Sequence, residues 1–302
     1  MARSPSEDPR LNRVGKLRVF IVSVFFLSLP FLFTHHAQHR FKRPSSLTTV
    51  PFNPSWEIPP MTSSEKEEVF SILSSPCRYL NRGNQSYVFE TKDGKYVIKL
   101  FRYRSTRFPF LQQMKALVNG CYHKKVKDPL PLKINKTFGA ARLAFTEAKP
   151  FTQIVFCHLN LTNNQLPITQ FKIGKTSYRL AMDRCRFVIQ KKVTPFSIAM
   201  LEAREDPAQM HFQIDSLISL FIERTAKGIR NSDPNLAPNF GFLEGKAVEI
   251  DFGNYRKIVM DPKIRFSEIN NFMTRFRHWL IKNAPEYIGY LDQKFIKIKE
   301  VL

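Results

Sequence analysis

Four side chains have the types and the spacing that handling a phosphate group would require. Lys99 ends the run VIK, Asp233 opens DPNLAPN, and Asp251 stands in the run IDFG. A lysine can neutralise phosphate oxygens, and a carboxylate can hold the Mg²⁺ that bridges them. Asp233 can accept a proton from an attacking hydroxyl, and Asn239, six residues later, offers an amide oxygen to the metal. The set predicts phosphoryl-transfer chemistry, although each residue alone also suits a surface strand or a turn.

The elements around Lys99 are expected to be strands. Between residues 79 and 102, two runs of alternating apolar side chains flank Asp93-Gly94, a dipeptide that favours a tight turn. A first strand is expected to end at Gly83. Backbone amides in the turn after that strand can lie over phosphates, so Gly83 is predicted to contact a nucleotide.

The acidic residues are expected to follow a long helix. Asp206-Pro207 predicts its start, because aspartate caps helices and proline suits their first turn. Asp233 follows this helix, and a hairpin over residues 240–250 leads to Asp251. The other expected elements are short helices from Ser64 to about Leu73 and at 138–149, strands at 154–159, 178–180 and 186–191, and a C-terminal helix that begins near Ser267.

This order of features resembles the signature of the protein-kinase-like superfamily over about residues 77 to 256. More closely, QSYVF, DGKYVIK, FVIQKK and NFGF followed by EIDFG are similar to uncharacterised kinase-like proteins of chlamydiae. The resemblance implies ATP and Mg²⁺ as cofactors. Lys99 then matches the phosphate-binding lysine, Asp233 the catalytic-loop aspartate, and Asn239 and Asp251 the metal ligands.

The resemblance also implies a helix glutamate that pairs with Lys99. Only Asp128 and Glu147 are acidic between Lys99 and Asp183, and Glu147 is the one in the expected helix. Glu147 is therefore the predicted partner. Residues 187–192, FVIQKK, match the connection between lobes, whose backbone would bind the adenine.

Several departures from the kinase pattern leave the function open. The expected glycine loop has one glycine, Asn231 and Ser232 replace the usual histidine and arginine, and only 49 residues follow Gly253. One reading is an ATP- and Mg²⁺-dependent phosphotransferase whose protein or small-molecule substrate is unknown. A second is an inactive pseudokinase that acts as a binding or scaffold module. A third is a basic protein that binds membrane surfaces or nucleic acid.

An uncharged run, Val19 to Phe33, predicts a membrane anchor near the N-terminus. With its neighbours it just reaches the length that a spanning helix needs. A cleaved signal peptide is the rival reading. The excess of basic residues before the run favours a cytoplasmic N-terminus, which would place the folded part away from ATP, so the orientation stays open.

These features predict an α+β, bilobal, kinase-like fold behind a single transmembrane helix. The expected parts are a basic segment at 1–16, the anchor at 17–34, a proline-rich linker at 35–64 and a domain at 65–302. Within that domain a mainly β N-lobe is expected at about 65–191 and a small helical C-lobe at about 192–302. The net charge of +22 favours an anionic partner such as a nucleotide or an acidic lipid.

Overall fold

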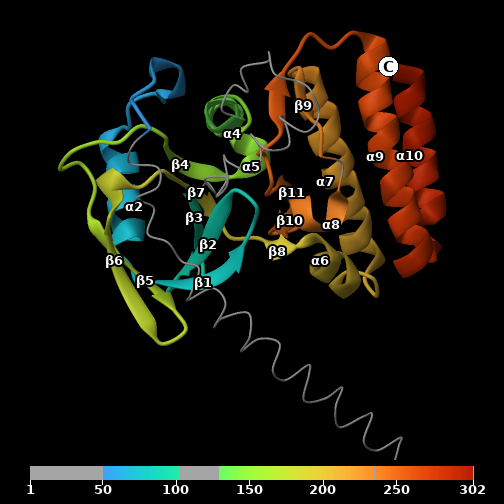
Figure 1. Cartoon of the computed structure of the whole chain (residues 1–302). Coiled ribbons are helices and arrows are strands. Elements are labelled where there is room, and N and C mark those ends of the chain that lie inside the picture. The colour runs from blue at the N-terminus through green and yellow to red at the C-terminus, as the bar shows by residue number, and fades with distance from the viewer. Residues whose placement is uncertain (1–49, 103–128, 234, 302) are drawn as a thin grey trace, which may run out of the picture.

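The computed structural model describes residues 50–102, 129–233 and 235–301, which form a mixed α+β structure (Figure 1). A seven-stranded sheet occupies the N-terminal part, and helices dominate the C-terminal part. Neighbouring strands of the sheet are antiparallel except β1 and β5. In spatial order its strands are β4 (Ile154–His158), β7 (Phe187–Lys191), β3 (Tyr96–Phe101), β2 (Ser86–Thr91), β1 (Cys77–Arg82), β5 (Ile168–Ile173) and β6 (Thr176–Ala181).

The strand that carries Lys99 is central to this sheet. Lys99 lies opposite Val88 of β2 and Val188 of β7. The tight turn before β3 forms as predicted, because Gly94 adopts a φ of 71° that other residues rarely accept. Helix α2 (Ser63–Ser74) packs its apolar side chains into one core with the sheet. Lys99 is thus held on a backbone bonded from both sides.

The C-terminal part is built around α7 (Pro207–Ala226) and α9 (Pro262–Asn283), whose Phe221 and Phe272 rings stack 3.5 Å apart. Asp206 caps α7 as predicted, since its side chain accepts from two backbone amides of the first turn. The other elements are α6 (Phe196–Glu202), α8 (Leu236–Asn239), α10 (Ile288–Val301), a sheet of β8 (Thr194–Pro195), β10 (Phe240–Leu243) and β11 (Lys246–Glu249), and the pair β9 (Ile229–Asn231) and β12 (Tyr255–Lys257).

Several elements differ from the sequence-based expectation, among them one strand and one helix of the N-terminal part. Strand β5 was not predicted, although its residues alternate between exposed and buried. Helix α4 (Pro129–Thr146) begins well before the expected start at residue 138, and α5 (Lys149–Thr152) follows it. The early start matters because it places Thr137 within the helix rather than ahead of it.

The expected linker at 35–64 is described from residue 50, and this portion packs on the domain. Trp56, in the 3-10 helix η2 (Pro54–Trp56), is buried and meets Phe138 edge to face at 4.9 Å. Arg186 Nη2 donates to the Val50 carbonyl at 2.8 Å. Apart from η2, residues 50–62 form no helix or strand, as their prolines favour, and the linker boundary at residue 64 stays a prediction.

The membrane anchor predicted at 17–34 lies outside the described residues and stays a prediction. Within the ranges that the structure describes, every helix is too short or too polar to cross a bilayer. Of the four cysteines, Cys77, Cys157 and Cys185 are buried free thiols, and Cys121 lies outside the described ranges.

The close contact between β10 and the segment before β8 predicts a stability effect at Gly241. A Cβ there would lie 2.6 Å from the Thr194 carbonyl oxygen and still closer to the Val193 side chain. We expect Gly241→Ala to lower the free energy of unfolding by about 2 kcal/mol, measured by urea denaturation. Gly139→Ala is the control, because its Cβ meets nothing within 4 Å and alanine suits α4 better, for a gain of roughly 0.5–1 kcal/mol. Equal stability of both variants would contradict this packing.

Candidate functional site

A cavity of about 600 Å³ lies between the seven-stranded sheet and the C-terminal part, a volume typical of small-molecule sites. We call it the central cavity. Four of the six predicted site residues line it, namely Gly83, Lys99, Asp233 and Asp251. Chain segments far apart in the sequence therefore converge on one space.

Lys99 reaches across this cavity from β3 to the segment that carries Asp251. Its ammonium group donates to the carbonyl of Ile250 and lies 5.1 Å from the centre of the Phe252 ring. Burial lowers the pKa of Lys99 to about 8, although the negative charge of Asp251 opposes that shift. Lys99 is therefore positively charged at neutral pH, but its surroundings favour the charged form less than water does.

The Asp251 carboxylate is exposed, and the loop between β1 and β2 approaches it. Asp251 Oδ1 accepts a hydrogen bond of 3.0 Å from the Gly253 amide. A Cβ at Gly253 would lie 2.9 Å from Gln85 Oε1, so glycine permits this close approach. Gln85 also lines the central cavity, and the sequence-based prediction missed it because it considered only the glycine of that turn.

Asn239 is the last residue of α8, shortly after Asp233 in the sequence, but only Asp233 lines the central cavity. The Asn239 side chain is buried, and its Nδ2 donates to the Asp233 carbonyl at 3.3 Å. The Asn239 carbonyl accepts from the Ile250 amide at 2.7 Å and from the Asp251 amide at 3.3 Å. Asn239 thus joins the two acidic segments, and its role as a metal ligand stays a prediction.

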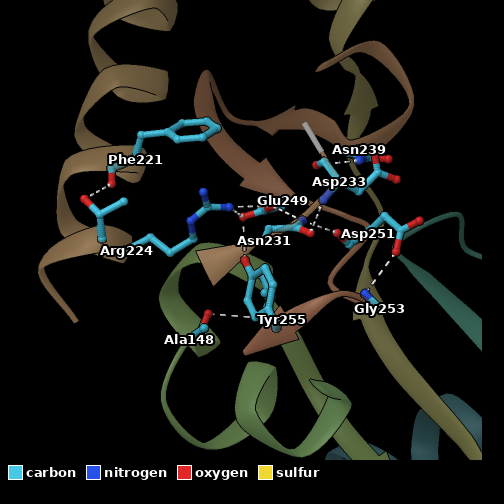
Figure 2. A network of polar contacts seen from close by, with 12 residues as sticks. Ala148, Phe221, Arg224, Asn231, Asp233, Asn239, Glu249, Asp251, Gly253 and Tyr255 are labelled. Carbon is cyan, nitrogen blue, oxygen red and sulfur yellow. Dashed lines mark hydrogen bonds and ion pairs between the residues drawn. The ribbon is translucent and has the colours of Figure 1, made fainter. Parts of the chain in front are cut away.

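A buried polar network adjoins these loops, and Figure 2 shows its side chains. Glu249 of β11 is fully buried and accepts two hydrogen bonds of 2.7 Å from Arg224 Nη1 of α7. The same carboxylate accepts from Asn231 Nδ2 at 2.6 Å and from the Tyr255 hydroxyl at 2.5 Å. Burial and then the charge of Glu249 raise the pKa of Tyr255 well above its ordinary value, so its hydroxyl stays a donor.

Asn231 connects this network to both acidic segments. Its Nδ2 also donates to the Asp251 carbonyl at 3.1 Å, and its Oδ1 accepts from the Asp233 amide at 3.0 Å. The sequence-based prediction treated Asn231 as a departure from the kinase pattern. In the structure it is the side chain that sets the positions of the Asp233 and Asp251 backbones.

The predicted pairing of Lys99 with Glu147 is wrong. Glu147 follows the last turn of α4, is exposed, and forms an ion pair with Lys257 of β12. Helix α4 itself contains no acidic residue, and the side chain that it contributes to the central cavity is Thr137. Because the sequence-based helix began at residue 138, Thr137 was missed. The Ile250 carbonyl takes the place of a carboxylate beside Lys99.

The predicted connection between the two parts, residues 187–192, is β7 with one further residue. Gln190 to Val193 line the central cavity, and the chain then enters β8. Gln190 is buried, and its Nε2 donates to the Thr152 carbonyl at 2.5 Å. The segment where adenine was expected to bind thus borders the same cavity as Lys99.

A metal ion in this site would need ligands besides carboxylates. Across the residues that the structure describes, no three His, Cys, Asp or Glu side chains gather closely enough to hold one. Mg²⁺ commonly uses one or two carboxylates and completes its shell with water and substrate phosphates. Asp251, which lines the cavity, fits that mode, which requires bound nucleotide, whereas the buried Asn239 does not line the cavity.

Neither a family model nor a curated protein matches this sequence. Among solved structures, the bifunctional kinase-methyltransferase WbdD is similar at a TM-score of 0.35 and 13% identity, over 64% of this chain and 38% of that one. Rv3197 from Mycobacterium tuberculosis, in complex with erythromycin, scores 0.32 at 14% identity, over 80% of this chain and 67% of that one. The ternary complex of APH(2'')-IIa with streptomycin and ATP has a TM-score of 0.25 at 12% identity, over 77% of this chain and 87% of that one.

Scores and identities of this size assign neither a family nor an activity to the chain. The similarity to chlamydial kinase-like proteins finds no support in these comparisons. Any assignment of function therefore rests on the residues of the central cavity and on the order in which the chain brings them there.

The buried ion pair predicts a large stability effect at Glu249. Glu249→Gln leaves the Arg224 charge buried without a counter-charge, and we expect a loss of about 3–5 kcal/mol in the free energy of unfolding. The double variant Arg224→Leu, Glu249→Leu should lose less, because no buried charge remains. Asp292→Asn is the control, since it breaks an exposed pair with Arg277, for at most about 1 kcal/mol. Urea denaturation measures all three, and an equal loss in the two single variants would contradict this account.

Proposed function

We propose that this chain is an ATP- and Mg²⁺-dependent phosphotransferase of kinase-like type. The observation that carries the proposal is the convergence of Lys99, Asp233 and Asp251 on one cavity of suitable size. These residues lie on a strand, a loop after a long helix, and a loop after a hairpin, which is the order of the kinase signature. Chance rarely brings a lysine and two carboxylates together in that order.

Each residue has a separate task in this proposal. Lys99 binds phosphate oxygens of the nucleotide, and Asp251 with Asn239 holds Mg²⁺, which when bound neutralises charge on the phosphates. Asp233 orients the acceptor hydroxyl and takes its proton. The bond between the γ-phosphorus and the β,γ-bridging oxygen breaks, a bond from the acceptor oxygen to that phosphorus forms, and ADP leaves. Gln190 to Val193 line the part of the cavity where the adenine is proposed to lie.

The low pKa of Lys99 predicts how nucleotide affinity depends on pH. The free protein loses the Lys99 proton as the pH rises through about 8, whereas bound phosphates raise that pKa. Affinity for Mg²⁺-ATP should therefore be constant below about pH 8 and fall by up to roughly tenfold per pH unit above it. Lys99→Met should bind more weakly and show no such slope. Calorimetric titration checks both, and a flat profile in the unaltered protein would contradict this role of Lys99.

We expect Asp251 to serve metal binding and Asp233 to serve acceptor activation, so that variants of the two residues have different effects. Asp251→Ala should abolish Mg²⁺-dependent ATP binding, because it removes the carboxylate that holds the ion against the phosphates. Asp233→Ala should retain binding but lose roughly 10²-fold or more in ATP turnover, the scale of a lost general base. Glu205→Ala is the control, since it removes an exposed charge outside the cavity and should change neither. Unchanged turnover in Asp233→Ala would refute its role.

A second candidate is a pseudokinase that binds nucleotide and acts as a scaffold. The specific observation in its favour is that Lys99 has no carboxylate partner from α4 and donates instead to a backbone carbonyl. Binding of Mg²⁺-ATP without turnover in the unaltered protein would favour this candidate. A membrane anchor at 17–34 and binding to acidic lipid remain predictions that fit either candidate.

A further inference from the structure

A second hollow lies beside the Asp233 loop, between α8 and α9. Its volume is about 620 Å³, and we call it the basic groove. Asn235 to Pro238 form one wall, and exposed side chains of α9 form the other. Pro238 lines both this groove and the central cavity. The two spaces therefore meet at the loop that begins with Asp233.

The groove is lined by basic side chains, although Arg275 also borders a smaller cavity that Asp233, Glu249 and Glu268 line. Arg275, His278 and Lys282 line it, three and then four residues apart, so they share one face of α9. Its lining contains no aspartate or glutamate. Among the described residues, none of these three side chains has a hydrogen bond or ion pair, whereas Arg277 of the same helix pairs with Asp292. The basic groove is thus ready to bind an anion.

Arg275 brings this charge close to the catalytic aspartate. A smaller cavity of about 170 Å³ is lined by both Asp233 and Arg275, and Arg275 lines the basic groove as well. A ligand whose anionic group lies at Arg275 can therefore extend toward Asp233. Half-buried Trp279, held edge to face against Phe196 at 5.0 Å, adds a flat apolar surface within the groove.

We propose that the basic groove binds the phosphoryl acceptor, and that this acceptor is a small hydroxyl compound carrying a phosphate or carboxylate group. The inference rests on the proposed function, because only a phosphotransferase needs an acceptor beside Asp233. Guanidinium and ammonium groups match both kinds of anion, and the Trp279 face suits the carbon frame of a small molecule such as a sugar. The volume fits a small molecule, and three basic residues are few for a polymer.

Trp279 allows acceptor binding to be measured without nucleotide or turnover. The chain has two tryptophans, and the other, Trp56, is buried against Phe138 and does not line the groove. In the full-length protein we expect glucose 6-phosphate to change tryptophan fluorescence saturably and uncharged glucose to have no effect. Glucuronate distinguishes a carboxylate from a phosphate requirement. Trp279→Phe should remove the signal.

Matched variants test the charge of the groove. Arg275→Gln should weaken glucose 6-phosphate binding by at least about tenfold, the equivalent of one charge-assisted hydrogen bond. Lys263→Gln is the control, because it removes an exposed charge from the first turn of α9 and should leave the affinity unchanged. Both side chains are exposed, so both variants should fold, which their thermal unfolding checks.

Calorimetric titration with Mg²⁺-ATP separates this inference from the proposed function. Nucleotide binding together with equal responses to glucose and glucose 6-phosphate, or with no response to either anion, would overturn the groove assignment and leave the proposed function standing. An equal loss of affinity in Lys263→Gln and Arg275→Gln would also overturn it. Absence of Mg²⁺-ATP binding would count against the proposed function itself, whatever the fluorescence shows.

Discussion

The ion pair between Arg224 and Glu249 is the interaction on which the site depends. Both side chains are almost completely removed from water, which is costly unless each charge is compensated. Glu249 meets that condition by accepting from Arg224, Asn231 and Tyr255, which come from a helix and two other strands. Because Asn231 also bonds the backbones of Asp233 and Asp251, the residues that compensate one buried carboxylate also hold these two acidic segments together.

Lys99 shows a different solution to a similar constraint. A buried ammonium group loses hydration and requires an acceptor, and here a backbone carbonyl supplies it. A carbonyl carries no full charge, so the pKa of Lys99 falls to about 8 as burial requires. The site therefore has more to gain from an arriving phosphate than one in which a glutamate already neutralises the lysine. Such a lysine suits both an enzyme and a module that only binds nucleotide.

The segment that carries Asp233 and α8 borders two spaces of different chemical character. The central cavity is lined by two carboxylates, Asp233 and Asp251, and by three lysines, Lys99, Lys191 and Lys192, whereas the basic groove contains only cationic and neutral side chains. Phosphoryl transfer requires donor and acceptor on opposite sides of the group that moves. A loop that borders both spaces, with Asp233 at its start, has the position that such a transfer needs.

Local sequence determined much of this protein. The strand with Lys99, its Asp93-Gly94 turn, the Asp206 cap and the hairpin before Asp251 all follow from short-range backbone preferences, and all form as predicted. Only the tertiary structure determined which groups contact the predicted site residues. Glu147 follows the last turn of α4 and pairs with Lys257 rather than Lys99. The basic groove is lined by residues of α8 and α9 that lie more than thirty positions apart in the sequence. A buried charge pairs with a group that is close to it in space. The number of residues between two groups in the sequence does not determine that distance.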